Sequence, residues 1–137
     1  MTQLFKKVAC FTDIHFGRRN NSRSHNQDCE NFVDWFCKTA KANGCDTAIF
    51  LGDWHDHRAS INVSTLNYTV SNLETLSKNF EKVYLISGNH DLYYREKREI
   101  NSLPFARNID NIIIVNEQLT DGNVTIVPWL VDEEWKR

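Results

Sequence analysis

The chain has 137 residues, of which 41% are hydrophobic and 25% are charged, a composition typical of one ordinary globular domain. Its formal net charge of −2 excludes a strongly basic nucleic-acid-binding protein, although an enzyme can still contact nucleic acid locally or through metal ions. The sequence has neither an apolar run as long as a membrane span nor the apolar core of a signal peptide at its N-terminus, so we expect a cytoplasmic protein without a membrane partner.

The first predicted strand, Leu4–Thr12, leads directly into two polar side chains. Asp13 and His15 follow the apolar run, two residues apart. Because both come straight after a strand, we expect them to point into the same cleft. A polar loop is predicted over Arg18–Asn26.

A helix is predicted over Asp28–Asn43, because its apolar residues recur at helical spacing. Ser24, with Gln27 three residues later, suits a capping box, and Gly44 suits the end of the helix. A second buried strand, Thr47–Leu51, follows.

This second strand also ends in polar residues. Asp53 and Asp56 come soon after it, together with His55 and His57. A second helix is predicted over Asn62–Asn79, where apolar residues again share one face.

The third predicted strand, Val83–Ile86, stops at a Ser-Gly turn. Three polar residues then follow without a spacer: Asn89, His90 and Asp91. An amide, an imidazole and a carboxylate are thereby placed at the end of a buried strand.

The remainder is predicted as a loop with a short helix over Tyr93–Leu103, a fourth strand over Asn111–Val115 and a fifth over Val124–Trp129. Strands therefore alternate with helices as βαβαβ, and two strands follow. This order predicts an α/β fold with a largely parallel sheet. The sequence contains no internal repeat and no linker, so it is one domain or part of one.

Four cysteines, Cys10, Cys29, Cys37 and Cys45, show no CxxC spacing. We interpret them as reduced, mostly buried thiols rather than as a disulfide or zinc framework.

Three successive strands thus end in polar groups, and the carboxyl ends of parallel strands meet at one edge of a sheet, where ligands bind. Carboxylate, imidazole and amide donors together suit manganese, iron or zinc. A carboxylate has two oxygens, so one aspartate can bridge two ions about 3.5–4 Å apart, as in two-metal phosphoester sites.

These strand ends carry three motifs: Asp13-x-His15, Gly52-Asp53-x-x-Asp56 and Gly88-Asn89-His90-Asp91. In this order they resemble the first three motifs of the calcineurin-like metallophosphoesterase superfamily. Within it the chain is most similar to the SbcD-like nuclease subunit of the double-strand-break repair complex, of the phage recombination endonuclease type. Phe16-Gly17 after the motif histidine, Asp rather than Glu after Asn-His, and the Ile126–Trp129 segment carry this closer resemblance.

The resemblance implies a metallophosphoesterase sandwich that is incomplete, with residues 1–137 as the N-terminal half of a four-layer αββα nuclease domain. It implies two further motifs, Gly-His and Gly-His-x-His, but no histidine follows His90. We therefore expect that this polypeptide alone is an incomplete enzyme: a fragment, the first product of a split gene that pairs with a C-terminal complementing chain, or a truncated homologue. We also expect an apolar face of the sheet to be left uncovered.

Roles for individual residues follow from the resemblance. Asp13 and His15 would bind one ion, Asp53 would bridge two and Asn89 would bind the second. His90 would act as an acid or contact the phosphate, oriented by Asp91. The resemblance implies two divalent ions as cofactors, for which manganese is the preferred identity. The second site would be incomplete in this chain.

Other polar residues near these motifs would have supporting roles or none. Asp56 would support the site from behind the ligands. His55 or His57 would either reach the cleft or be polar loop residues, and His25 is interpreted as a surface residue. Three loop arginines would either contact DNA phosphates or form a solvated loop: Arg18, Arg19 and Arg23.

The implied function is hydrolysis of DNA phosphodiesters by an endo- or exonuclease subunit in recombination and repair. The implied partners are DNA, a coiled-coil ATPase subunit and a second copy of the nuclease chain, in a host cytoplasm if the chain is encoded by a phage. Two alternatives stay open. One is a small-molecule or cyclic-nucleotide phosphodiesterase, and the other is a non-catalytic assembly or regulatory module of the same fold.

Overall fold

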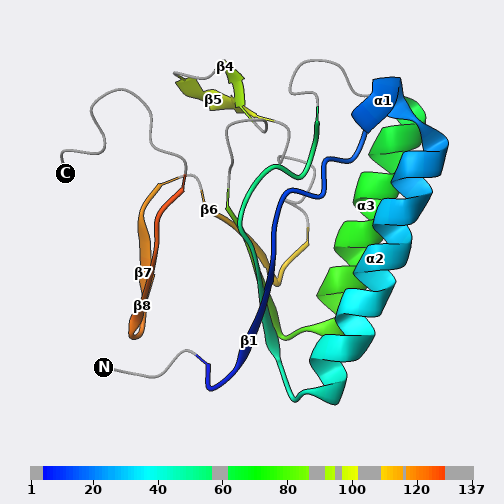
Figure 1. Cartoon of the computed structure of the whole chain (residues 1–137). Coiled ribbons are helices and arrows are strands. Elements are labelled where there is room, and N and C mark those ends of the chain that lie inside the picture. Colours follow the sequence, from blue (N-terminus) through cyan, green and yellow to red (C-terminus); the bar gives the residue numbers. More distant parts are fainter. Residues whose placement is uncertain are drawn as a thin grey trace.

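The computed structural model describes residues 5–56, 62–86, 92–94, 97–101, 109–115 and 117–128, with side chains except in 92–94 and 97–101. A four-stranded sheet in the order β1-β2-β3-β6 runs through the middle of the molecule (Figure 1). Its strands are β1 (Val8–Phe11), β2 (Thr47–Phe50), β3 (Lys82–Ile86) and β6 (Ile112–Val115). All three pairings are parallel, which confirms the parallel α/β sheet predicted from the alternation of strands and helices.

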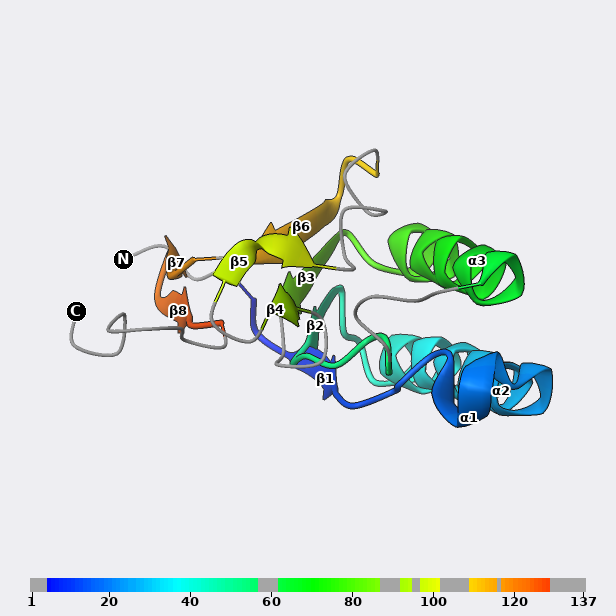
Figure 2. The same ribbon diagram turned by 90° about the horizontal axis from the view of Figure 1, so that it is seen from above.

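Two long helices, α2 (Arg23–Ala42) and α3 (Val63–Asn79), lie side by side on one face of the sheet (Figure 2). α3 begins where the sequence predicts, because the Asn62 side chain accepts a hydrogen bond from the Thr65 backbone N–H. α2 ends at Ala42, one residue before the predicted end, and Gly44 follows its cap residue Asn43 with a φ of 75°, in the left-handed region typical of the residue that stops a helix.

The start of α2 differs from the prediction. The helix begins at Arg23 because Ser22, and not Ser24, caps it, with Ser22 Oγ accepting the backbone N–H of His25. The residues predicted as a polar loop therefore form the first turn of α2 and a preceding single turn, α1 (Arg18–Asn21). Within α1, Arg19 and Asn20 both have a φ of 57°.

The chain beyond β3 also differs. Where a loop with a short helix is predicted, β4 (Leu92–Tyr94) and β5 (Lys97–Asn101) pair as an antiparallel hairpin. The predicted fifth strand is β8 (Val124–Ile126), which ends three residues early and pairs with β7 (Leu119–Asp121) rather than with the sheet.

The core has two layers, because alternate residues of the strands face opposite sides of the sheet. Val83 and Leu85 pack toward the helices in an aromatic-rich cluster that includes Phe11, Phe50 and Trp54. The opposite face carries a second cluster: Ile49, Tyr84, Ile86, Val115 and Ile126. A sheet buried on both faces explains the nearly continuous apolar runs in its strands.

This second cluster corrects an expectation. The face predicted to be uncovered is buried at Ile49, Tyr84 and Ile86, because the β7–β8 hairpin packs against it (Figure 1). The Tyr84 hydroxyl donates to Asp121 Oδ2 at 2.9 Å, which ties β3 to the hairpin.

The four cysteines are free thiols, but the expectation that they are mostly buried holds only for two of them, since Cys10 is exposed and Cys45 is half-buried. Cys29 and Cys37 are buried, and burial raises the pKa of each to about 11, which makes them unreactive near neutral pH. Among the helices that the structure describes, none is long and apolar enough to cross a membrane.

Candidate metal centre

Asp13, His15 and Asp53 come together at the carboxyl ends of β1 and β2. One potential ligand atom from each lies within 4.8 Å of the others. His15 Nε2 is 3.4 Å from Asp13 Oδ1 and 4.0 Å from Asp53 Oδ2. Two carboxylates and an imidazole nitrogen facing one point form a donor set that suits a divalent ion such as manganese, iron or zinc.

Backbone hydrogen bonds join the two loops that carry these side chains. The N–H groups of Asp13 and His15 donate to the carbonyls of Gly52 and Asp53, at 2.9 and 3.1 Å. Further along, Phe16 forms an isolated parallel bridge with His55. The parallel pairing of β1 and β2 thus continues past the ends of the strands and fixes the loops relative to each other.

All three potential ligands have left-handed backbone conformations. The φ angle is 58° at Asp13, 54° at His15 and 63° at Asp53. Aspartate and histidine tolerate this region better than most residues, but it still costs about 1–2 kcal/mol for each. Strain of this kind concentrates at functional sites, where the surrounding structure holds it in place.

Asp56 contacts the far side of the His15 ring. Asp56 Oδ1 is 3.2 Å from His15 Nδ1. A carboxylate at this distance favours the tautomer with the hydrogen on Nδ1, which leaves the lone pair of Nε2, the nitrogen nearer Asp13 and Asp53, available for an ion. A carboxylate behind a ligating histidine fixes both the ring orientation and the tautomer. This is the position that the supporting role predicted for Asp56 requires.

The Asp13 carboxylate is stabilised in its charged form. The Thr12 hydroxyl donates to Asp13 Oδ2 at 2.8 Å. This bond is the largest influence on the pKa of Asp13 and lowers it below 3.8, against the opposing effect of partial burial. Asp13 is therefore an anionic ligand at neutral pH. Sequence reasoning missed Thr12, which lies within the predicted strand.

The third motif, with Asn89, His90 and Asp91, lies outside the residues that the structure describes, as does His57. Their roles stay predictions. The loop arginines Arg18, Arg19 and Arg23 are described and exposed, in α1 and at the start of α2.

His55 has a different role from either one predicted. Its side chain is fully buried in the core rather than in the cleft or on a polar loop. The Thr69 hydroxyl accepts the indole N–H of Trp54 at 3.2 Å and shares a hydrogen bond of 2.6 Å with His55 Nε2. Nε2 of His55 is thereby engaged with α3.

His55 predicts a dependence of stability on pH. Burial lowers its pKa from 6.5 to about 3. Below pH 6.5 the unfolded chain takes up a proton at His55 and the folded chain does not. The contribution of His55 to the free energy of unfolding is therefore complete above pH 6.5, and it falls by up to about 1.4 kcal/mol per pH unit as the pH drops toward 3. In urea unfolding between about pH 7 and 5, His55→Gln should lose stability less steeply than the wild type. Equal slopes would exclude this role for His55.

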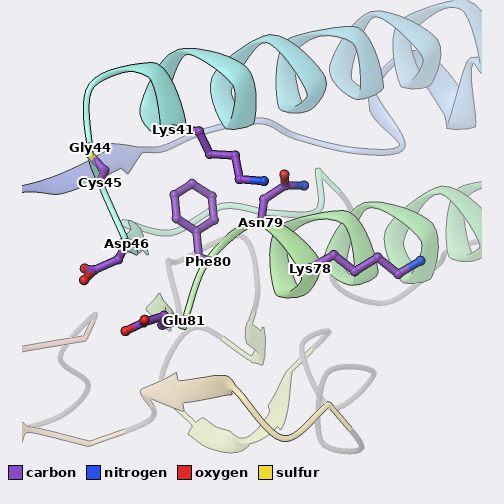
Figure 3. A pocket seen from close by; sticks show the side chains of 8 residues that line it. All are labelled: Lys41, Gly44, Cys45, Asp46, Lys78, Asn79, Phe80 and Glu81. Carbon is purple, nitrogen blue, oxygen red and sulfur yellow. The ribbon is translucent and has the colours of Figure 1, made fainter.

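The pocket shown in Figure 3 is separate from the potential ligands. It has a volume of about 440 Å³ and lies at the opposite, amino-terminal ends of β2 and β3 (Figure 3). It is lined by Lys41, Gly44, Cys45, Asp46, Lys78, Asn79, Phe80 and Glu81. A pocket at that edge does not share the arrangement by which parallel sheets bind ligands at the carboxyl ends of their strands.

The chain is similar to two nucleases. It is 29% identical over 99 residues to exonuclease subunit 1 of Enterobacteria phage T4, a match that spans 69% of this chain and 29% of that protein. It also matches the crystal structure of the nuclease MPE of Pseudomonas putida with a TM-score of 0.57 and 24% identity, over 83% of this chain and 50% of that chain. The second likeness shows the fold. The chain thus spans less than a third of the phage protein and half of the solved nuclease.

A family model agrees with the motifs and the fold. The model described as calcineurin-like phosphoesterase matches residues 6–131, which include both loops of the candidate metal centre. The chain therefore belongs to the calcineurin-like phosphoesterase family.

Proposed function

We propose that this chain is the N-terminal part of a metal-dependent DNA phosphodiesterase, an endo- or exonuclease subunit of the SbcD-like branch. The observation that carries the proposal is the convergence of Asp13, His15 and Asp53 within 4.8 Å, with Asp56 behind the His15 ring. The similarity to a phage exonuclease subunit supports DNA as the substrate.

The side chains at this site suit one divalent ion, which we propose is manganese. Asp13, His15 and Asp53 would hold it, and Asp56 would keep His15 Nε2 available. An ion at such a site lowers the pKa of water and polarises phosphoryl oxygens. The Asp13 carboxylate, kept ionised by Thr12, would balance part of the charge of the ion.

The second ion would share Asp53 and use Asn89, and its other ligands would come from the family's downstream histidine motifs on a complementing chain. His90 would act as an acid or contact the phosphate, oriented by Asp91. The exposed side chains of Arg18, Arg19 and Arg23 would contact DNA phosphates, which attract arginine regardless of base sequence. A coiled-coil ATPase subunit and a second nuclease chain are the proposed protein partners.

The function is tested by measuring hydrolysis with manganese, using the chain alone and the chain combined with a polypeptide that carries the Gly-His and Gly-His-x-His motifs. We expect the combined protein to degrade linear duplex DNA, the chain alone to be much slower, and chelation of the metal to stop the reaction. Asp53→Asn in the combined protein should be inactive.

The substrates separate the alternatives. Turnover of a cyclic nucleotide or a small chromogenic diester, with DNA left intact, would contradict the proposal and indicate a small-molecule phosphodiesterase. A combined protein that binds manganese but hydrolyses none of these substrates would indicate a non-catalytic module.

A further inference from the structure

The first turns of α2 contact the loop that carries His15. The His25 side chain, predicted to lie on the surface, is only partly exposed, and its Nε2 lies 2.9 Å from the backbone carbonyl of His15. Because a carbonyl only accepts, this nitrogen carries the hydrogen and donates it. One turn later, Cys29 Sγ donates to the carbonyl of Ile14 at 3.2 Å. Two consecutive carbonyls of the loop are therefore bound by one helix.

Asn26 binds the next part of the same loop. It is fully buried, its Oδ1 accepts the backbone N–H of Gly17 at 2.8 Å, and its Nδ2 donates to Thr65 Oγ1 at 3.0 Å. Gly17 has a φ of 90°, and a Cβ there would lie 3.2 Å from Asn21 Oδ1. A buried amide with both ends hydrogen-bonded is a rigid anchor, because breaking either bond leaves a polar group desolvated.

These contacts matter because His15 is held in a strained conformation. With a φ of 54°, its backbone persists only while neighbouring groups fix it. Its N–H donates to Asp53 O on one side. On the other side its carbonyl accepts from His25 Nε2 at 2.9 Å and from the Arg18 backbone N–H at 3.2 Å. The same backbone sets the direction of the ring whose Nε2 faces Asp13. Losing the His25 bond would leave this carbonyl with the longer bond from the Arg18 N–H, so the strained backbone would relax and turn Nε2 away from the two carboxylates.

We propose that His25 is a positioning residue of the metal centre, which holds the backbone of His15 so that its ring can ligate the ion. The inference rests on the metal site proposed above. His25 would contact neither the metal nor the substrate. Because α2 begins at Arg23, its first turn carries His25 next to the loop of the metal centre.

The test compares two replacements of similar size. His25→Gln keeps an N–H donor at a comparable reach, whereas His25→Leu removes it. We expect manganese affinity, measured by calorimetry on the full chain, to fall about tenfold in His25→Leu and to stay within about threefold of the wild type in His25→Gln, since groups that support a ligand are worth about 10–100-fold when they contact it directly. Ser24→Ala, an exposed neighbour on the same turn, is the matched control and should bind as the wild type does.

Two further measurements distinguish positioning from general stability. Ring ¹⁵N chemical shifts of His15 should report the Nδ1–H tautomer in the wild type and His25→Gln, and a mixture in His25→Leu. Unfolding midpoints in chelator should show all three variants folded. Equal affinities in His25→Leu and the wild type, or equal losses in both His25 variants, would overturn the role of His25, provided that Asp53→Asn abolishes binding. Unchanged binding in Asp53→Asn would instead overturn the metal site itself.

Discussion

Asp53→Asn should abolish calorimetrically detectable manganese binding. Asp53 is the potential ligand from the loop after β2, and the other two, Asp13 and His15, come from the loop after β1. Removing a group that merely supports a ligand weakens metal binding about 10–100-fold, so removing a charged ligand should cost at least about 100-fold. Asparagine is preferable to alanine here because the φ of 63° at Asp53 suits asparagine, and the loop is then retained.

The matched control is Asp34→Asn. Asp34 is exposed on α2 and is not among the potential ligands, so this variant removes the same charge from the chain without touching the site. It should bind manganese as the wild type does. Equal binding by both variants would show that Asp53 is not a ligand.

Asp56→Ala should weaken manganese binding by about 10–100-fold, or about 1.4–2.7 kcal/mol. Without the carboxylate 3.2 Å from Nδ1, the His15 ring is free to rotate and to take the tautomer that carries the hydrogen on Nε2. That tautomer offers no lone pair toward Asp13 and Asp53. Asp56→Asn, whose side-chain oxygen can still accept the Nδ1 hydrogen, should lose less.

The fold should survive both changes at Asp56. The backbone N–H of Asp56, which donates to the Phe16 carbonyl at 2.9 Å, is independent of the side chain. Thermal unfolding in the presence of a chelator checks this, since bound metal would otherwise stabilise the wild type selectively. Unaltered manganese affinity in Asp56→Ala would exclude the supporting role and leave His15 oriented by its backbone alone.

The elements with strong periodicity were predictable. The β2 and β3 strands are short apolar runs bounded by turns, and α3 has both an apolar face and an asparagine cap, so local and tertiary preferences agree. The start of α2 was not predictable, because Ser22 and Ser24 are both suitable helix caps and only the folded backbone decides between them.

The two hairpins were missed for different reasons. β5 (Lys97–Asn101) is mostly charged and polar, so its pairing depends on β4 rather than on an apolar pattern. The β7–β8 hairpin did carry a signal, since Asp121-Gly122 is a dipeptide typical of tight hairpin turns. A three-residue strand on each side of it gave too short a pattern to be recognised.

The potential ligands were predictable from the sequence, but the residues that hold their loop in place were not. Asp13, His15 and Asp53 follow strands, and parallel strands bring such residues to one edge whatever the details of packing. His25 and Asn26 act on the same loop from a helix, and Thr65 acts from another helix. No local pattern distinguishes them from surface residues. His55 shows the converse, because a histidine close to a ligand in sequence can be committed to the core.

The most direct test of the metal centre is anomalous diffraction from crystals of the chain grown with manganese. We predict a peak between the side chains of Asp13, His15 and Asp53, with His15 bound through Nε2 and Asp56 hydrogen-bonded to Nδ1. A peak at another place, or an ordered loop with all three side chains turned apart and no peak between them, would contradict the assignment of this cluster as a metal site.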